Sequence, residues 1–362
     1  MLKFTEPLKL GINIYIRTTL FNYMNDIIRK AINFEEVDRV PIAPVLTTYS
    51  GELEKVNKIF KKITSCCQID GFLLHPNTFI TGYLYTPCKV GQKEAIPTMQ
   101  SPKEYDDLAS SVIDFIEKKH KEFNLIPDLF EKIQANVSVM KKFVEEWEKN
   151  KGIAVYCGSL AIAPFGFIAY HRGLVESLKD IVRYPEEVKN ACLTVAEELT
   201  DYIVELVGEI GLNRVWVSMA YSTPEILGGY FTEFSWTPLK VMLKRFISQG
   251  IVPIVQFDVN ISGIINILKE LRGYIIHVDS STDILKVAKE LGGFACVMGN
   301  IPFDILKTDE EVKEYCVKIL QGFRNTSFIL SSEGGSPLIV SDYCPSKLKT
   351  FVNTVKQFRY PM

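Results

Sequence analysis

The segment Gly250–Ser281 contains two short apolar runs with a helix-like stretch between them, and this order strongly limits the folds open to the chain. The apolar runs are Ile251–Phe257 and Tyr274–Val278, and the stretch Ile261–Leu271 between them has apolar residues at helical spacing. Such an order is typical of two parallel strands joined by a crossover helix. We therefore expect a parallel sheet.

Polar residues stand where both predicted strands end. Asp258 follows the first run directly, His277 is close to the end of the second, and Asp279 follows it. Because the carboxyl ends of parallel strands meet at one edge of a sheet, these three side chains are expected to converge. Enzymes with parallel α/β folds hold their reacting groups at that edge.

Similar runs recur along the chain. Each is short and apolar on both faces, as in a parallel sheet that is covered on both sides. The predicted strands are Val40–Thr47, Gly71–His75, Ile153–Ser159, Arg214–Met219, Ile251–Phe257, Tyr274–Val278, Ala295–Gly299 and Ser327–Ser332.

Amphipathic segments with helix start and stop signals separate most of these strands. Thr308 precedes a segment with acidic residues in its first turn, and Gly250 closes another. The alternation predicts an α/β fold of the (β/α)8, or TIM-barrel, type, with residues 1–362 in one domain. The predicted helices are Pro185–Ile210, Thr237–Ser248, Ile261–Leu271, Thr282–Leu291, Thr308–Phe323 and Ser346–Phe358.

Two segments do not fit the simple alternation. Residues 1–33 are expected to form an N-terminal arm and a helix. Residues 80–150 contain two charged amphipathic helical patterns, Pro102–His120 and Pro127–Lys149, after a segment rich in turn residues. An insertion of this length between two barrel strands is expected to form a helical cap over the mouth of the barrel.

Composition excludes several classes of partner. The 362 residues are 47% hydrophobic and 23% charged, which suits a large globular core. The net charge of −2 provides no basic field for nucleic acid. No apolar run reaches the roughly 18 residues of a membrane-spanning helix. The eight cysteines are scattered and form no CxxC pair, which indicates reduced thiols and a cytoplasmic protein.

Four segments in sequence order resemble the uroporphyrinogen decarboxylase superfamily. Its members begin with a helix, a DRVP sequence and the first strand, and the resemblance covers nearly the whole chain from Phe34 onward. The segments are FEEVDRVPIAPVL at 34–46, PTMQSPKEYDDL at 97–108, CVMGNIPFDILKTDEEVKEYC at 296–316 and FILSSEGGSP at 328–337.

Within that superfamily the chain is most similar to corrinoid-linked methyltransferases, and in particular to the aromatic O-demethylase branch. This resemblance implies transfer of a methyl group from a methoxylated aromatic, or another small methyl donor, to the Co(I) of a separate corrinoid protein in anaerobic metabolism. The cobalamin belongs to that partner, because the DxHxxG lower-ligand motif is absent. A homodimer is left open. The segments are VWVSMAYSTPEIL at 215–227, YFTEFSWTPLKVML at 230–243 and IIHVDSSTDILKVAKELGG at 275–293.

Two departures from the relatives narrow the activity. Porphyrin decarboxylases carry an arginine-rich segment after the first strand, whereas Thr47–Val56 contains no arginine to pair with propionates. Thiol-methylating relatives bind zinc through an HxC motif and a later cysteine, whereas the corresponding positions here are Gln256-Phe257-Asp258 and Ser331–Gly334. Both thiolates are missing, which disfavours thiol activation.

The resemblance implies a zinc site of oxygen and nitrogen ligands instead. It assigns Asp258 and His277 as ligands and catalytic residues, with Asp279 or Glu333 completing the set. Zinc held in this way could polarise an ether oxygen. Structural interpretations remain open: Asp258 and Asp279 could cap helices, His277 could be a buried hydrogen-bonding residue, and Glu333 could belong to a turn.

Other residues near predicted strand ends are expected to line the substrate pocket. Tyr221, just past the fourth strand, is the expected aromatic contact at the reacting group. The expected substrate-binding residues are Tyr49, His75, Tyr83, Trp216, Met219, Gln256 and Asn300.

Three other functions stay open at this point. One is a metal-free lyase that, like uroporphyrinogen decarboxylase, acts on a carboxylated ring. Another is a protein like the methylcobamide:thiol methyltransferases with an altered metal site. The last is a non-enzymatic descendant that binds a corrinoid or a small aromatic compound.

Overall fold

The computed structural model describes residues 26–47, 53–74, 80–89, 94–157, 161–323, 327–334, 338–339 and 345–358. All strand pairs in these ranges are parallel and form two sheets, ordered β10-β1-β2-β3 and β4-β5-β6-β7-β8-β9. The strands are β1 (Val45–Thr47), β2 (Gly71–Leu74), β3 (Ala154–Cys157), β4 (Ala161–Ile162), β5 (Arg214–Ser218), β6 (Val252–Phe257), β7 (Tyr274–Val278), β8 (Ala295–Ile301), β9 (Phe328–Ser332) and β10 (Leu338–Ile339).

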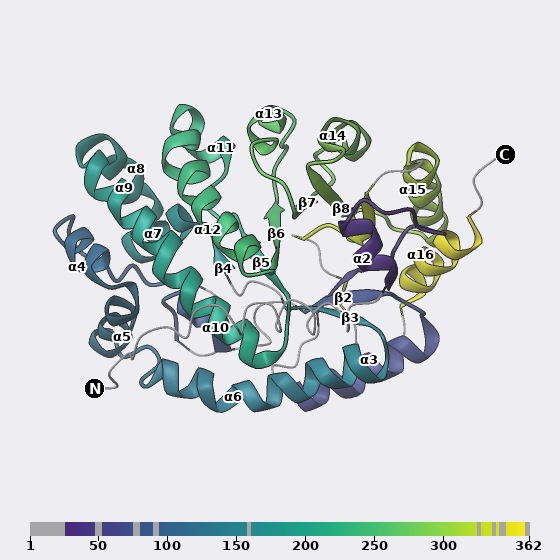
Figure 1. Cartoon of the computed structure of the whole chain (residues 1–362), viewed down its shortest axis with the longest axis horizontal. Helices are drawn as coiled ribbons and strands as arrows, with labels where there is room; N and C mark the ends of the chain where they lie inside the picture. Colours follow the sequence, from purple (N-terminus) through teal and green to yellow (C-terminus); the bar gives the residue numbers. More distant parts are fainter. Residues whose placement is uncertain are drawn as a thin grey trace.

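Helices surround these strands, as Figure 1 shows. After residues 80–150, strands and longer helices alternate along the chain, as in a barrel built of strand–helix units. The helical segments are α2 (Asp26–Ile32), α3 (Leu53–Cys66), η3 (Ile80–Leu84), α4 (Glu104–Ser110), α5 (Val112–Glu122), α6 (Leu129–Val144), η4 (Glu145–Asn150), α7 (Pro164–Arg172), α8 (Leu174–Arg183), α9 (Pro185–Thr194), η5 (Val195–Leu199), α10 (Thr200–Ile210), α11 (Pro224–Leu227), η6 (Gly228–Tyr230), η7 (Phe231–Trp236), α12 (Thr237–Ser248), α13 (Ile265–Leu268), α14 (Ile284–Leu291), α15 (Asp309–Gly322) and α16 (Ser346–Gln357).

Contacts between the two sheets close the strands into a ring. On one side, Ile42 just before β1 forms a parallel bridge with Leu330 of β9. The Val45 N–H also donates to the Ser332 hydroxyl at 2.8 Å. On the other side, the Arg214 guanidinium of β5 donates to the Val155 carbonyl of β3 at 2.9 Å. The expected parallel barrel is therefore the arrangement of the described strands.

Arg214 replaces backbone pairing where β3 meets β5. Its guanidinium forms an ion pair with Glu148 of η4 and lies over the Tyr156 ring, 5.1 Å from the ring centroid. The Glu148 carboxylate in turn accepts the Val155 N–H at 2.9 Å. Burial lowers the pKa of Arg214 to about 9. We call Val155, Glu148 and Arg214 the β3–β5 seam.

The two faces of the strands bury different clusters. Alternate residues such as Val215, Val217 and Val255 pack with the helices, whereas Trp216 and Ile254 belong to a second, inner cluster. Helix α2 adds Ile28 and Ala31 to this inner cluster from the end where the strands begin. The period of two in each strand therefore separates the helical layer from the barrel interior.

Every predicted strand is present, and some boundaries differ for local reasons. The first begins at Val45 rather than Val40, because Pro41 and Pro44 have no N–H for a strand ladder. The crossover helix shortens to Ile265–Leu268, since the Asn260 side chain accepts the Ser262 N–H at 2.9 Å and holds the chain in a turn.

Several helices, among them α3, α7 and α8, were not predicted from the sequence, and one expected helix is interrupted. In α7, residues 164–169 and 171 are buried, so the segment shows no amphipathic pattern. It is followed by α8 without a long loop. The predicted helix Pro185–Ile210 is divided by a π-helical turn at Val195–Leu199.

The segment 80–150 is helical as expected, but a cap is not confirmed. Helix α4 packs against α9, and α6 packs against α10. Figure 1 shows α6 along the outer edge of the molecule, in the helical layer. The apolar stripe of α6, which includes Ile133, Val137 and Met140, explains this position because it is buried. Of the expected N-terminal arm, residues 1–25 lie outside the described residues.

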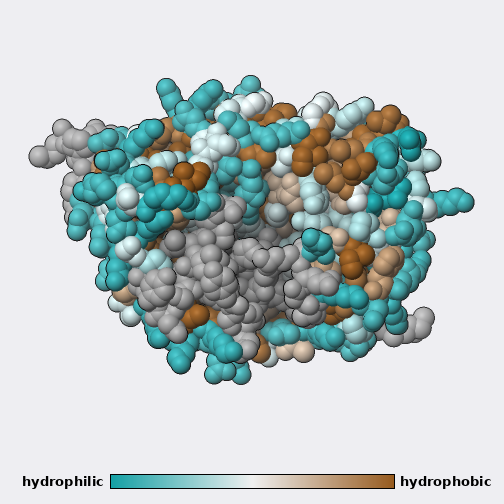
Figure 2. Space-filling model, turned by 180° about the vertical axis from the view of Figure 1, so that it is seen from behind, coloured by the Kyte–Doolittle hydropathy of each residue, from teal (hydrophilic) through white to brown (hydrophobic). Residues whose placement is uncertain are grey.

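The surface shown is mixed in polarity, and most of the described cysteines are free thiols. On the face shown in Figure 2, hydrophobic side chains are interspersed with hydrophilic ones. None of the described helices has the length and apolar character needed to cross a membrane. Cys67, Cys88, Cys192, Cys296 and Cys316 are buried free thiols, as expected. Cys66 is the exception, because it is disulfide-bonded.

Replacing Arg214 by methionine is expected to destabilise the protein by about 3–5 kcal/mol, because Glu148 would keep a buried charge without a partner. Urea unfolding followed by circular dichroism measures this loss. Arg245→Met is the matched control, since the ion pair of Arg245 with Asp201 is exposed and should contribute less than about 1 kcal/mol. Equal stabilities of the two variants would contradict the structural role of the β3–β5 seam.

Candidate functional site

His277 lies on the inner face of β7, one strand repeat beyond the inward-facing Ile275. The side chain is fully buried, and its Nε2 lies 2.8 Å from the Ser332 carbonyl oxygen. A carbonyl oxygen only accepts, so Nε2 carries the proton and Nδ1 keeps a lone pair. Nδ1 has no hydrogen-bond partner in the described part of the chain. Burial lowers the pKa of His277 to about 4, so the ring is neutral near pH 7.

Trp216, Gln256 and Asp258 form a connected group beside His277. The Trp216 ring lies 4.8 Å from the His277 ring, centroid to centroid. The Trp216 Nε1–H donates to Gln256 Oε1 at 2.5 Å, which fixes the orientation of the amide because the indole N–H is only a donor. Gln256 Nε2 then donates to both Asp258 carboxylate oxygens at 2.7 Å.

Gly334 gives the Gln256 side chain its space. A Cβ at residue 334 would lie 2.3 Å from Gln256 Nε2 and 2.5 Å from its Cδ. Any side chain at this position would therefore displace the amide that bridges Trp216 and Asp258. This is a steric role for one glycine of the Gly334-Gly335 pair.

Asp279 and Glu333 lie together at the ends of β7 and β9. The Ser280 N–H donates to Glu333 Oε2 at 2.8 Å, which brings the second carboxylate next to Asp279. Burial is the main cause that raises the pKa of Asp279, and the negative charges of Glu333 and Glu225 raise it further. The Ser281 hydroxyl and N–H, which donate to Asp279 Oδ1, oppose the rise.

Asn300 and Tyr315 border this pair of carboxylates. The buried Asn300 amide donates to the Asp279 backbone oxygen at 2.9 Å and to the Thr282 backbone oxygen at 3.2 Å. The Tyr315 hydroxyl donates to Asn300 Oδ1 at 3.4 Å. Burial, followed by the charges of Glu333 and Asp279, raises the pKa of Tyr315 to about 12. Asn300 therefore fixes the loop after β7, and direct substrate binding by it remains a prediction.

The remaining predicted substrate residues have different positions. Met219 is buried, and Tyr83 and Tyr221 are half-buried. Ala220 has a φ of +38°, a strained left-handed conformation that turns the chain after β5. Beyond this turn the Tyr221 ring lies 5.1 Å from that of Tyr170. Two more predicted substrate residues, Tyr49 and His75, lie outside the described residues.

The predicted metal ligands do not form a metal centre as they are arranged. His277 is tied to Ser332, Asp258 to Gln256, Asp279 to Ser281 and Glu333 to Ser280. Across the ranges that the structure describes, no group of three or more histidine, cysteine or acidic side chains could hold a metal ion. The unpartnered His277 Nδ1 alone does not define a zinc site. We derive no chemical step through zinc.

Three residues of the site were missed in the sequence. Ser331, inward-facing two residues after Ile329, is fully buried, and its hydroxyl has no partner among the described residues. The charge of Glu225 raises the pKa of Asp279, and the charge of Asp279 in turn raises the pKa of Tyr315. The alternation of β9 could have indicated Ser331, whereas Glu225 and Tyr315 belong to helices whose approach to the strand ends depends on packing.

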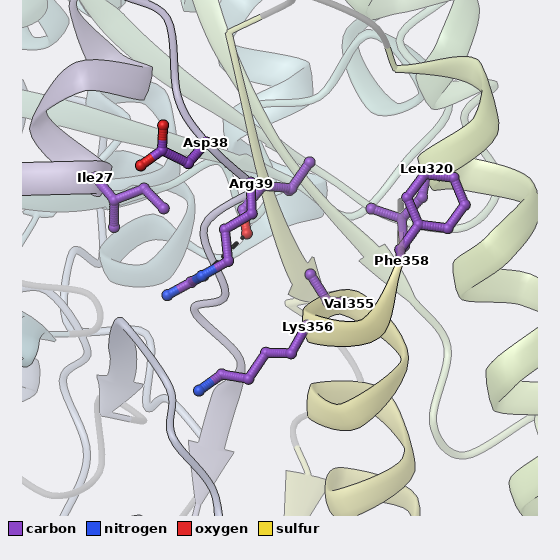
Figure 3. A pocket seen from close by; sticks show the side chains of 8 residues that line it. Ile27, Asp38, Arg39, Leu320, Val355, Lys356 and Phe358 are labelled. Atoms are coloured by element: carbon purple, nitrogen blue, oxygen red, sulfur yellow. Dashed lines mark hydrogen bonds between the residues drawn. The ribbon is translucent and has the colours of Figure 1, made fainter. Parts of the chain in front are cut away.

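A separate cavity of about 450 Å³ lies at the opposite end of the barrel. It is bordered by segments that precede β1 and by the last turns of α15 and α16, where the strands begin. Figure 3 shows the side chains of Arg39 and Lys356 extending to the same side of it. Arg39 is paired with Asp70 at 2.6 and 2.7 Å. The lining residues are Ile27, Asp38, Arg39, Val40, Leu320, Val355, Lys356 and Phe358.

The parallel barrel and the polar groups at its carboxyl end define the chain as an α/β-barrel protein with a site at the strand ends. Residues 108–358 match the family model described as "Uroporphyrinogen decarboxylase (URO-D)". Because this match covers well over half of the chain, the protein belongs to the uroporphyrinogen decarboxylase family.

Individual relatives are more distant. A uroporphyrinogen decarboxylase from Thermodesulfovibrio yellowstonii is 33% identical over 124 residues, which cover 34% of this chain and 36% of that protein. The chain thus matches only about a third of the length of this relative. The solved structure of a methyltransferase from Methanosarcina mazei superimposes with a TM-score of 0.66 at 15% identity, covering 92% of this chain and 98% of that one. This likeness shows a shared fold.

The buried neutral His277 is expected to make stability fall with acidification. Its pKa in the folded protein, about 4, is below the ordinary value of 6.5, so the unfolded chain binds the proton first as the pH falls. The contribution is complete above pH 6.5, and on the order of 3 kcal/mol is lost between pH 6.5 and 4.

Urea unfolding of wild type and His277→Phe across this pH range measures the effect. The variant should show a shallower decline with falling pH, whatever its absolute stability. His171, whose pKa is lowered to about 3 by burial, keeps its own contribution in both proteins and provides the remaining slope. Identical slopes for the two proteins would show that His277 is not held neutral.

Proposed function

We propose that the protein is a methyltransferase that removes the methyl group of a methoxylated aromatic and transfers it to the Co(I) of a separate corrinoid protein. The observation that carries this proposal is the chemistry of the strand ends. The three residues after each of β5, β6, β7 and β8, and the two described residues after β9, include no lysine, arginine, histidine or cysteine. The groups that the two better-known activities of the superfamily require are thus missing there.

A porphyrin decarboxylase must bind several carboxylates, and paired cations provide that binding. The described mouth instead holds Asp258, Asp279 and Glu333, and the sequence Thr47–Val56 contains no arginine. These charges would repel such a polyanion. A thiol methyltransferase needs thiolate ligands, and Gln256 and Asp258 occupy the positions at which the HxC motif is expected. The fold likeness to the methyltransferase from Methanosarcina mazei is compatible with the remaining choice.

In this reaction the protein binds the aromatic ring of the methyl donor and holds its methyl group toward the mouth of the barrel. Tyr221 and Tyr170 offer an aromatic surface beside the end of β5. A corrinoid held by the partner protein would supply a Co(I) nucleophile to take the methyl group, and the electron pair of the broken carbon–oxygen bond would stay on the phenolate. We assign Tyr221 the contact with the departing aromatic group. Trp216 and Gln256 keep Asp258 and His277 in place beneath it.

Methyl transfer is expected with at least one methoxybenzene and a reduced corrinoid protein, and it is followed by the absorbance change from Co(I) to methyl-Co(III). Tyr221→Ala should lower the rate by about tenfold or more, because a wall of the ring pocket is lost. Tyr202→Ala is the control, since Tyr202 packs on Phe130 between α10 and α6. Release of carbon dioxide from a carboxylated pyrrole, without transfer from any methoxyarene, would favour the lyase function.

Metal content tests the site independently of turnover. Because the four predicted ligands are engaged separately, protein purified without chelators is expected to hold well below about one zinc per chain. Elemental analysis measures the content. About one zinc per chain, lost in both Asp258→Ala and His277→Ala, would contradict this and would establish the zinc site that the sequence resemblance implies.

A further inference from the structure

We propose that the site selects its methyl donor by charge, accepting neutral or cationic methoxyarenes and rejecting those that carry a carboxylate. This inference rests on the proposed function and deepens it, because it names the class of aromatic donor. It is carried by the arrangement of Asp279, Glu333 and Glu225 together with two buried polar atoms that have no partner among the described residues.

The three carboxylates come from separate elements and share one region. Glu333 follows β9 and accepts the N–H of Ser280, the residue after Asp279. Glu225 is in the first turn of α11, which follows β5. The negative charges of Glu333 and Glu225 both act on the Asp279 carboxylate, and those of Glu333 and Asp279 act on the Tyr315 hydroxyl. Two groups on different elements therefore experience the same negative field.

No cation compensates these carboxylates within the part of the chain that the structure describes. The described ion pairs include acidic groups such as Asp70, Glu148 and Asp180, but not Asp279, Glu333 or Glu225. Among the described residues, the contacts of Asp279 and Glu333 are hydrogen bonds from Ser280 and Ser281, which carry no charge. The site therefore keeps a net negative charge close to its protein walls, where the dielectric constant is lower than in water.

A second observation points to a ligand with donor groups. His277 Nδ1 and Ser331 Oγ are both fully buried, face the barrel interior by the alternation of β7 and β9, and have no partner among the described residues. Nδ1 is an acceptor, since Nε2 carries the proton toward Ser332. A buried acceptor without a partner is costly, so a ligand or a water with an N–H or O–H would stabilise it.

These acceptors and negative charges lie toward the ends of β7 and β9, and Tyr221, with the Tyr170 ring against its own, follows the end of β5. An ammonium group would be attracted by the carboxylates and by the faces of the rings. A phenol hydroxyl would provide a donor at no electrostatic cost. A benzoate carboxylate would offer only acceptors and would be repelled, and such repulsion is a common basis of specificity.

The test compares the binding of three ligands of similar shape without a corrinoid protein. Titration calorimetry with 4-methoxybenzylamine, 4-methoxyphenol and 4-methoxybenzoate gives each Kd. We expect the amine to bind most tightly and the benzoate about tenfold or more weakly than the phenol. The difference should shrink as salt is raised, because Glu225 is exposed and Asp279 is partly exposed to solvent.

Charge-removing variants locate the effect. Glu225 is exposed, so the Glu225→Gln variant should fold normally. It should reduce the discrimination against the benzoate severalfold. Glu333→Gln keeps an acceptor for the Ser280 N–H and should act in the same direction. Glu145→Gln is the control, since this exposed residue lies in η4 before β3 and pairs with Lys149. It changes the net charge by the same amount and should leave the order of ligands unchanged.

The outcomes separate this inference from the proposed function. Benzoate binding as tight as that of the phenol, or no binding of any of the three ligands, would overturn the charge selection. The expected binding order combined with no methyl transfer from any donor would support the charge selection and would reject the proposed reaction. An unchanged discrimination in both Glu225→Gln and Glu333→Gln would also overturn the inference.

Discussion

The ring of strands depends on how β3 and β4 are joined to β5, because among the described residues only β4 pairs with β5 through the backbone. Between β3 and β5, one guanidinium and one carboxylate take the place of such pairing: Arg214 binds the Val155 carbonyl, and Glu148 binds the Val155 N–H and the guanidinium. Buried ion pairs are costly unless hydrogen bonds support them, and the backbone of β3 supplies two such bonds here, one to each partner. The register of β5 itself is fixed by backbone pairing, with Ala161 of β4 opposite Val217 and Val252 of β6 opposite Arg214.

The alternation of inward-facing and outward-facing side chains along the strands produces the site. Trp216 and Ile254 fill the interior lower down, and the next inward positions hold Gln256, His277 and Ser331. The layer of Gln256, His277 and Ser331 is thus more polar than the layer of Trp216 and Ile254 below it. The core and the site are therefore consecutive layers of the same strands, and a shift of one residue in a strand would turn its site residues from the barrel interior toward the helices.

Hydrogen bonds hold the polar layer in an arrangement that differs from a metal centre. Gln256 is committed to Trp216 and Asp258, and Gly334 leaves just enough space for it. Glu333 is committed to the loop after β7. A carboxylate held by such hydrogen bonds still contributes its negative charge, although it does not converge with other ligands on a common metal position. The physical property that dominates the mouth is thus an uncompensated negative field, which acts on whichever donor the site binds.

The strands, the order of the elements and the meeting of Asp258, His277 and Asp279 at one sheet edge follow from the sequence, because they depend on local periodicity and on the geometry of parallel pairing. The same reasoning missed α7, whose buried surface has no amphipathic pattern. The cap predicted for residues 80–150 is not confirmed, and the apolar stripe of α6 packs on α10. Family-specific segments in the sequence indicated the uroporphyrinogen decarboxylase family correctly. Only tertiary structure decided which nitrogen of His277 is free, which carboxylates share a field and that Glu225 and Tyr315 belong to the site. These depend on contacts between residues far apart in the chain, which no local pattern encodes.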